Sequence, residues 1–463
     1  MGSRLKNMTT GRPAPLILTF ALPLMVGNMF QQLYTVVDAM VVGRFLGVSA
    51  LAALGAADWL NWMMLGITQG FAQGFAIPMA QEFGAGRHDR LRQAVGAAAI
   101  LAACLALALV GLGQAAVDPI LRLLQTPDDI IGGSRLYLRI MYSGIPLVMS
   151  FNLLSGVLRS LGDSKTPLRA MITASVTNIS LDLLFVTVFR WGIAGAAAAT
   201  LIAQGVSGLF CLRHILKVDI LRLTKDDFRL RISRCAHLMA LGAPMAFQNC
   251  IISVGGMILQ GVINGFGVLF IAGYTATNKL FGTLELAAIS YGYAMITYVG
   301  QNLGAGKTRR IRQGVRAALL IALATSALVA AVMLLFGRTI VGGFISGTPD
   351  EVEQAVSIAY HYLAVMACCL PVLYLLHVVR STLQGMGNTV LPMVSGIMEF
   401  CMRTGVALLL SRIIGGAGVF YAEVSAWLGA DIVLVTSYLV AMKRLTPDAL
   451  EPYRPDVIRL SKR

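Results

Sequence analysis

The sequence predicts an all-α membrane protein whose twelve transmembrane helices form two homologous six-helix lobes, related by a pseudo-two-fold axis along the membrane normal. Three observations predict this fold class. The 463 residues are 57% hydrophobic and 13% charged, whereas about a quarter of the residues of a soluble domain are charged. Twelve apolar runs are each long enough to cross a bilayer as a helix. Segments of the first half of the chain also recur in the second half.

The apolar runs follow one another along the chain, with short polar segments between them. About twenty mainly apolar residues cross the hydrocarbon core of a bilayer as a helix. The first residues lack the pattern of a cleavable signal peptide, so the first run is predicted to remain as a span. We expect spans at roughly 14–41, 52–82, 92–117, 133–158, 166–189, 192–216, 236–262, 268–300, 312–336, 355–384, 391–413 and 416–442.

The distribution of Lys and Arg predicts how these spans are oriented. Cytoplasmic segments of membrane proteins are enriched in basic residues, and 28 of the 37 Lys and Arg residues fall in segments on the same side as the N-terminus. We therefore expect both termini in the cytoplasm and the acidic turns 126–129 and 348–351 outside. The net charge of +15 then reflects topology and contact with anionic lipid headgroups, and nucleic-acid binding is not expected. The 28 residues include Arg4, Arg159, Arg380, Arg454, Arg459, Lys462 and Arg463.

An internal repeat predicts the domain organisation. The sequence QEFGAGRHDRLRQ at 81–93 recurs as QNLGAGKTRRIRQ at 301–313, and Pro167 recurs as Pro392, 225 residues later. With six spans in each copy, both copies have the same orientation in the membrane. We expect an N-terminal six-helix lobe at 1–217, a cytoplasmic basic linker at 218–234 and a C-terminal six-helix lobe at 235–463.

Polar side chains inside the predicted spans indicate an ion site. Asn178 and Asp182 are four residues apart and share one face of the fifth span. An ionised carboxylate in hydrocarbon costs at least a few kcal/mol unless it is paired. Asp38 in the first span and Thr200 in the sixth lie at a similar depth, about 5–12 Å below the outer boundary at about 1.5 Å per residue. The four residues predict a site for a proton or Na⁺, because two carboxylates in one pocket compete for one positive charge. A buried hydrogen bond between helices is the alternative for either acid alone.

The repeat places different residues opposite this set in the second half. Because the counterparts of Asp38, Asn178 and Asp182 are neither acids nor amides, the predicted ion site is confined to the first half. The counterparts are Ile258, Arg403, Ala407 and Glu423. Glu399 precedes Arg403 by four residues, so we expect these two side chains to neutralise each other on one helix.

Other charged residues of the second half leave alternatives open. Glu285 is expected either to pair with Lys279 or a backbone group, or to act as the counter-charge for a cationic substrate in a central cavity. Glu423 and Asp431 are eight residues apart and share a helical face that could line this cavity. His377 has no second ligand nearby in the sequence, and we expect it to be a hydrogen-bonded packing residue and not a proton relay.

Several segments resemble the multidrug and toxic compound extrusion (MATE) family, and the likeness covers nearly the whole chain. It is greatest for the bacterial branch whose ion site lies in the N-terminal half. On this resemblance Asp38, Asn178, Asp182 and Thr200 match the ion-coupling residues of that branch. The segments are GNMFQQLYTVVDAMVVGRFLG at 27–47, the GAG loop after the second span, LRSLGDSKTP at 158–167, NISLD at 178–182 and GIAGAAAAT ending at Thr200.

The resemblance implies an antiporter of the bacterial cytoplasmic membrane. It would export lipophilic, mostly cationic drugs and toxic compounds in exchange for H⁺ or Na⁺, by alternating access between the two lobes. If Na⁺ is the coupling ion, the same four residues would be its ligands. The acids of the second half do not match the acidic pair of the branch that uses its C-terminal half. Candidate residues of the substrate cavity are Gln31, Tyr34 and Tyr137, which match family positions, and Glu285, Tyr291 and Tyr293, which could hold a delocalised cation.

The alternative function is a flippase of lipid-linked saccharides from the same superfamily. An anionic pyrophosphate would need a cationic cavity, yet the acids within the predicted spans outnumber basic residues such as Lys279 and Arg403. An enzyme is not expected, because no cluster of His, Cys or Ser appears and the seven cysteines lack metal-ligand spacing. We expect no cofactor other than the coupling ion, and a monomer surrounded by membrane lipid.

Overall fold

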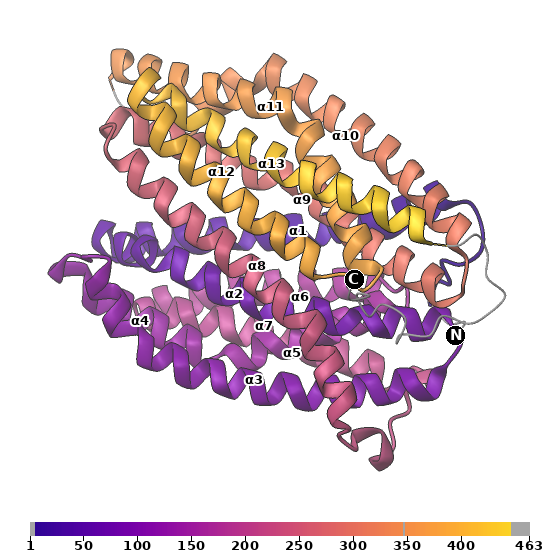
Figure 1. The fold of residues 1–463 in the computed structure, drawn as a ribbon. Coiled ribbons are helices and arrows are strands. Elements are labelled where there is room, and N and C mark those ends of the chain that lie inside the picture. Colours follow the sequence, from indigo (N-terminus) through magenta and orange to yellow (C-terminus); the bar gives the residue numbers. More distant parts are fainter. Residues whose placement is uncertain (1–4, 346–347, 446–463) are drawn as a thin grey trace.

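The computed structural model describes residues 5–345 and 348–445, which form helices joined by turns, with no β-strand in these two ranges. Figure 1 shows the helices of the second half (red to yellow) lying along those of the first half (indigo to magenta). The basic residues Arg4, Arg454, Arg459, Lys462 and Arg463 of the topology prediction lie outside the described ranges. The first half contains α1 (Pro13–Leu46), α2 (Val48–Gly84), α3 (His88–Leu123), α4 (Asp128–Ser143), α5 (Ile145–Ser160), α6 (Lys165–Asp182), the π-helix η1 (Leu183–Val188) and α7 (Ile193–Ile215).

The second half follows two short 3₁₀ helices, η2 (Asp219–Leu221) and η3 (Lys225–Phe228), which lie in the predicted linker. Within the described ranges, ten helices are long and apolar enough to cross a membrane, and the α4–α5 pair provides one more span. The helix α9, which has 37 residues and carries Lys279 and Glu285, is not among these spans by length and composition, and counting it gives the predicted twelve. The helices of this half are α8 (Ile232–Asn264), α9 (Val268–Gly304), α10 (Thr308–Gly342), α11 (Pro349–Gly385), α12 (Val390–Ile414) and α13 (Ala417–Arg444).

The predicted span at 133–158 is a bent pair of helices. α4 and α5 meet at an angle of 47°. Pro146 stands in the first turn of α5, where its missing N–H breaks the run of helical hydrogen bonds. Gly144 lies at the bend, and a Cβ atom there would be 2.0 Å from Leu201 Cδ2 of α7. The bend therefore brings α4 and α5 against α7 with no side chain between them at this position.

The first helix of each half packs partly against the other half. The large hydrophobic cluster of the second half includes Leu16, Phe20 and Leu24 of α1. In return, Leu238 of α8 belongs to the cluster of the first half. α1 also contacts α9, and α2 contacts α8. The two halves are thus joined by α1 and α8, each of which packs on both sides of the interface.

The interface is closed at the end that carries the two GAG loops, residues 84–86 and 304–306, here called the GAG end. The Gln81 side chain donates a hydrogen bond to Gly385 O at 3.1 Å, and the Gln301 side chain donates one to Ser160 O at 2.9 Å. The segment before α1 also contributes, because Met8 N donates to Gln301 Oε1 at 2.8 Å and the Met8 side chain is fully buried. Both halves and the N-terminal segment therefore meet at this end.

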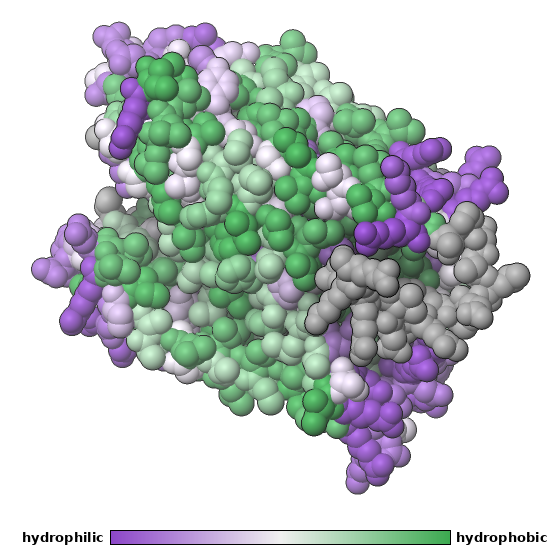
Figure 2. All heavy atoms as spheres, viewed as in Figure 1, coloured by the Kyte–Doolittle hydropathy of each residue, from purple (hydrophilic) through white to green (hydrophobic). Residues whose placement is uncertain are grey.

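The surface of the bundle is that of a membrane protein. Figure 2 shows hydrophobic residues over the middle of the molecule and hydrophilic residues gathered toward two opposite ends. Leu107, Leu112 and Leu335 are each more than two-thirds exposed. Such a band of exposed apolar side chains is explained by contact with lipid chains.

Arg380 lies inside a helix, although the topology prediction assigned it to a cytoplasmic segment. It stands in α11, is 8% exposed, and its Nη2 is 2.7 Å from Glu399 Oε2. The predicted span 355–384 already includes this position, and a partner on another helix keeps the charge in the core. Arg380 therefore carries no weight in the topology argument.

Candidate functional site

The fifth predicted span contains the central pair of the predicted ion site. Asn178 and Asp182 both lie on α6 and are fully buried. α6 ends at Asp182, where the backbone changes to the π-helix η1. π-helical turns inside α-helices are frequent at functional sites. Asp182 therefore stands at a break in helix geometry, within the interior of the first half.

Asn178 contacts the predicted partner on α7. Its Nδ2 donates a hydrogen bond to Thr200 Oγ1 at 3.3 Å, so the structure brings these two residues together. Asn178 Oδ1 and both carboxylate oxygens of Asp182 are buried and have no hydrogen-bond partner in the described part of the chain. The amide nitrogen of Asn178 thus binds Thr200, and its amide oxygen, a hydrogen-bond acceptor, has no partner among the described residues.

Asp38 of α1 completes the set. It is half-buried, and its Oδ1 has no hydrogen-bond partner among the described residues. Asp38 and Asp182 are close enough for their charges to interact. Asp38 also interacts electrostatically with Asp58, near the start of α2, and Asp58 with Lys279 of α9. Three acids from three helices are thus coupled by their charges.

The sequence analysis missed Asp58. Its signal is the same as that of Asp38, since both are acids within a predicted span and such residues are costly there. Gln204 of α7 was also missed, although it follows Thr200 by one helical turn. Its Nε2 lies 3.5 Å from Tyr34 Oη, and its Oε1 is buried without a partner in the part of the chain that is described.

The three cavity candidates of the first half surround these groups. Tyr34 and Tyr137 are buried, at 9% and 6% exposure, and both interact electrostatically with Asp38 and Asp182. Gln31 is half-buried and contacts the Tyr34 hydroxyl group. The hydroxyl groups of Tyr34 on α1 and Tyr137 on α4 therefore lie within electrostatic range of the two carboxylates.

This arrangement suits a proton or a small hard cation. Buried polar atoms are nearly always satisfied by a hydrogen bond, yet carboxylate and amide oxygens are left open here by all the described neighbours. Oxygen atoms of this kind are the ligands of hard cations. No group of three or more His, Cys, Asp or Glu side chains suited to a metal occurs among the described residues. The set therefore offers two carboxylates and neutral oxygens to such an ion.

The charged residues of the second half form a different arrangement. The predicted pair of Glu399 and Arg403 is confirmed at 3.3 Å, but it belongs to a larger network. Arg380 binds Glu399 at 2.7 Å, and Arg403 binds Glu423 of α13 at 2.8 Å. Two positive and two negative side chains alternate and neutralise one another. Asp431 lies within range of Arg380, and both of its oxygens are buried without a hydrogen-bond partner in the described ranges.

The remaining candidates separate in space. Glu285 Oε1 lies 3.3 Å from His377 Nε2, so its partner is this histidine and not Lys279. Tyr291 is 2% exposed, and its hydroxyl group lies 2.9 Å from Thr325 Oγ1 of α10, inside the second half. Tyr293 faces the first half, and its hydroxyl group accepts a hydrogen bond from Gln73 of α2 at 3.2 Å. Of these three, Tyr293 is the one that reaches across the interface.

The comparison with protein families decides the identity of the fold. The family model described as MatE matches residues 23–184 and 244–409, one stretch in each half. The chain belongs to the MatE family. It is therefore a membrane transporter and not an enzyme, as the sequence predicted. The two stretches begin at positions 23 and 244, and their separation agrees with the internal repeat.

Individual relatives agree with this assignment. The chain is 28% identical to the probable multidrug resistance protein YpnP of Bacillus subtilis, over 89% of this chain and 92% of that protein. It is 24% identical to the FAD transporter of Shewanella oneidensis, over 76% and 78% of the two chains. Among solved structures, a multidrug resistance MATE family transporter in an outward-facing conformation has a TM-score of 0.89 at 21% identity and covers 96% of this chain and 99% of its own. The predicted all-α membrane fold is confirmed.

Proposed function

We propose that this MatE family member is an antiporter that exports lipophilic, mostly cationic drugs and toxic compounds in exchange for H⁺ or Na⁺. The ion site is formed by Asp38, Asn178, Asp182 and Thr200, as in the branch with its ion site in the N-terminal half. The observation that carries the proposal is the group of buried, unpartnered oxygens on Asp38, Asn178 and Asp182. The multidrug resistance relatives support the substrate class.

Coupling follows from electrostatics. Two carboxylates that interact in a poorly solvated site repel each other, and a proton or Na⁺ between them removes this repulsion. The ion therefore favours the conformation in which Asp38 of α1 and Asp182 of α6 are close. A conformation that separates these helices releases the ion. Ion binding and the packing of α1 against α6 are thus linked.

α1 connects this site to the other half. Asp38 lies toward one end of α1, while Leu16 and Phe20 near the other end pack into the core of the second half. Pro23 stands between them, where its missing N–H weakens the helix and allows it to bend. A change in the position of Asp38 is therefore transmitted to the interface between the lobes, residues 1–217 and 235–463. The lobes alternate in access around a central cavity.

The orientation we propose places the GAG end in the cytoplasm. Lys307 and Arg310 follow one GAG loop, and Arg87 and Arg90 follow the other. Basic segments of this kind remain on the cytoplasmic side of a bacterial inner membrane. The closed GAG end is then the cytoplasmic end, and the ion site lies toward the outer side.

Transport of a cationic dye in proteoliposomes tests the proposal. A pH gradient and a Na⁺ gradient are imposed separately, and the gradient that drives dye movement identifies the ion. We expect Asp182→Asn and Asp38→Asn to abolish gradient-driven transport at unchanged expression. Asp431→Asn is the matched control, because it removes a buried, unpartnered carboxylate from the other half and is expected to retain coupling. Wild-type rates in the double variant of Asp38 and Asp182 would refute the ion site.

The flippase alternative is tested in the same vesicles. A lipid-linked saccharide carries a pyrophosphate group, whereas the interacting charges around the proposed ion site are those of three acids, Asp38, Asp58 and Asp182, and one base, Lys279. We expect no gradient-dependent movement of a fluorescent lipid-linked pyrophosphate. Its movement without dye transport would favour the flippase.

A further inference from the structure

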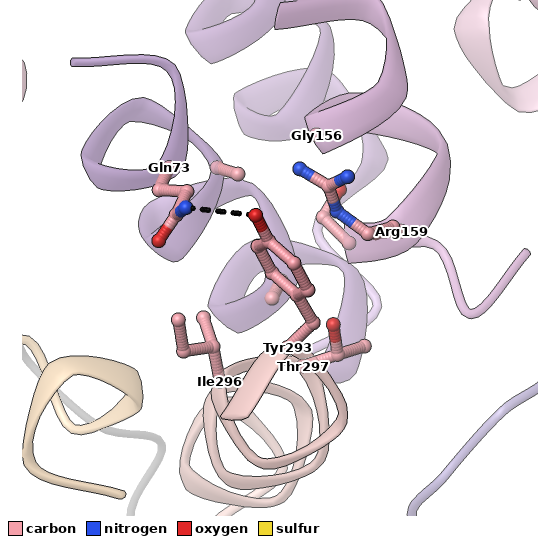
Figure 3. A pocket seen from close by; sticks show the side chains of 9 residues that line it. Gln73, Gly156, Arg159, Tyr293, Ile296 and Thr297 are labelled. Carbon is pink, nitrogen blue, oxygen red and sulfur yellow. Dashed lines mark hydrogen bonds between the residues drawn. The ribbon is translucent and has the colours of Figure 1, made fainter. Parts of the chain in front are cut away.

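A small cavity lies between the two halves, on the GAG side of the interface. Its volume is about 20 Å³, which is room for about one water molecule. Two of its lining residues, Gln73 and Tyr293, are 220 positions apart and so occupy equivalent places in the repeat. They contact each other, so the cavity lies where the equivalent helices α2 and α9 meet. Figure 3 labels its residues Gln73, Gly156, Arg159, Tyr293, Ile296 and Thr297.

Arg159 of α5 brings a positive charge to this cavity. Its guanidinium carbon lies 4.4 Å from the centre of the Tyr293 ring. Figure 3 shows the two side chains next to each other. Its Nη1 donates a hydrogen bond to Ser155 Oγ at 2.9 Å. No carboxylate of the described chain lies within 4.0 Å of the Arg159 nitrogens. A neutral hydroxyl group and an aromatic face are therefore its neighbours, in place of a counter-ion.

The guanidinium group of Arg159 has more N–H donors than hydrogen-bond acceptors among the described residues. Arginine carries five N–H donors, and the structure gives Arg159 one hydrogen-bond acceptor, Ser155. None of its nitrogens is among the buried polar atoms of the described chain that lack a partner. Arg159 and Tyr293 both line the cavity. Gln69 and Gln73 both donate to the Tyr293 hydroxyl group and hold the ring in place.

The positive charge of Arg159 has no counterpart at the equivalent position of the second half. The repeat aligns LRSLG at 158–162 with LQGMG at 383–387, so the counterpart of Arg159 is the neutral Gln384. Arg380 is the nearby buried arginine of the second half, and Glu399 neutralises it at 2.7 Å. The topology prediction counted Arg159 as a cytoplasmic basic residue, but it stands in the last turn of α5 and lines the cavity. Since an arginine without a counter-ion is costly inside a membrane protein, the lack of a carboxylate partner for Arg159 among the described residues favours a binding role.

We propose that Arg159 is an anion-binding residue of the transport pathway, which takes a carboxylate or similar oxyanion carried by an aromatic, otherwise lipophilic substrate. The proposal rests on the antiporter function and assigns Arg159 as a residue that determines specificity among its substrates. Arginine pairs with a planar oxyanion through two parallel hydrogen bonds, and Tyr293 offers a ring face to the aromatic part. The present cavity admits no such molecule. Substrate enters when the halves separate and the contact of Gln73 with Tyr293 breaks.

Two dyes with one ring system test this inference. Rhodamine 110 carries a free carboxylate, and rhodamine 123 is its cationic methyl ester. Their dissociation constants are measured by fluorescence anisotropy on the purified full-length protein in dodecyl maltoside, which holds no lipid phosphate. We expect the wild-type protein to bind rhodamine 110. In Arg159→Gln, the dissociation constant for rhodamine 110 should rise at least about tenfold relative to that for rhodamine 123. This is the change expected for the loss of a charge-assisted hydrogen bond.

Two further variants separate the charge from the packing. Arg159→Lys keeps the charge but cannot form the two parallel hydrogen bonds, so it should restore only part of the ratio between the two dissociation constants. Tyr293→Phe removes the hydroxyl group without changing the charge and should leave that ratio unchanged. An unchanged ratio in Arg159→Gln, or no binding of rhodamine 110 to the wild type, would overturn the inference. Because binding is measured without an ion gradient, this result is independent of the proteoliposome assay, whose failure would instead count against coupled antiport.

Discussion

Gln81 and Gln301 make the same hydrogen bond on opposite sides of the internal repeat. Each side chain donates across the interface, Gln81 to Gly385 O and Gln301 to Ser160 O, and the two acceptors are themselves equivalent, 225 positions apart. The backbone of each glutamine also packs against a glycine of the other half. A Cβ atom at Gly304 would lie 1.8 Å from Gln81 O. The GAG end is thus a symmetric closure that depends on two glycines, Gly84 being the second.

Gly304→Ala should open this closure, because the added methyl group cannot coexist with the Gln81 carbonyl oxygen at that distance. The measurement is labelling of Met8→Cys by a membrane-impermeant maleimide, in a background without other cysteines. Met8 is fully buried, and its backbone N–H is bound to Gln301. We expect labelling to be slow in the parent and fast in the Gly304→Ala protein.

The matched control is Gly405→Ala, a helical glycine of α12 with no atom of another residue within 4 Å of its added Cβ. This change should leave the labelling rate of Met8→Cys unaltered, since alanine in an open helical position is tolerated well. Equal labelling of both alanine variants would show that the GAG end does not depend on the close approach of Gly304.

Thr200→Val should weaken binding of the coupling ion. The variant has a similar shape but cannot accept the hydrogen bond from Asn178 Nδ2, which is 3.3 Å long in the structure. A hydrogen bond of this kind contributes about 1 kcal/mol, so we expect the ion concentration for half-maximal transport to rise a few-fold. Thr200→Ser retains the hydroxyl group and should behave as the wild type. A Val variant with unchanged ion dependence would remove Thr200 from the site.

Asp58→Asn and Lys279→Gln should shift ion affinity in opposite directions. Asp58 adds a negative charge near Asp38, and Lys279 adds a positive charge near Asp58. Because Asp58 and Lys279 are both exposed, water and salt screen the effect, and we expect changes of about threefold. Asp58→Asn weakens cation binding and Lys279→Gln strengthens it. Shifts of the same sign, or shifts that persist in 1 M choline chloride, would contradict this electrostatic explanation.

The parts of the site that could be predicted are those that local spacing determines. Asn178 and Asp182 are one helical turn apart, and the cost of a charge in hydrocarbon makes such a pair visible in any sequence. Glu399 and Arg403 were found by the same rule. The span boundaries also follow from local composition. The bend at Gly144 was missed because the whole of 133–158 is apolar enough for one straight span.

The parts that could not be predicted depend on contacts between helices. Glu285 meets His377, 92 positions later, and no spacing rule relates two residues that far apart. The ion pair of Arg380 was missed for the same reason, since its partner Glu399 lies on the next helix. The sequence also offered no way to distinguish Tyr291 from Tyr293. The two are neighbours on α9, yet one faces the interior of the second half and the other faces the interface.

Arg403→Met should destabilise the second half severely. Arg403 is 7% exposed at its side chain and is bound by both Glu399 and Glu423. Its loss leaves one buried carboxylate without a partner and the other with Arg380 alone. Removal of one member of a buried ion pair costs about 3–5 kcal/mol. We expect a large fall in the thermal unfolding midpoint, measured by the fluorescence of detergent-purified protein.

The control for this variant is Arg338→Gln, which breaks the ion pair of Arg338 with Glu353. Both side chains of that pair are more than half exposed, and an exposed pair contributes at most about 1 kcal/mol. Its loss should therefore leave the midpoint nearly unchanged. A triple variant, Arg403→Met with Glu399→Gln and Glu423→Gln, should recover part of the lost stability, because no unpaired buried charge remains at these positions. If the triple variant is no more stable than Arg403→Met alone, the cost lies in packing and not in the uncompensated charge.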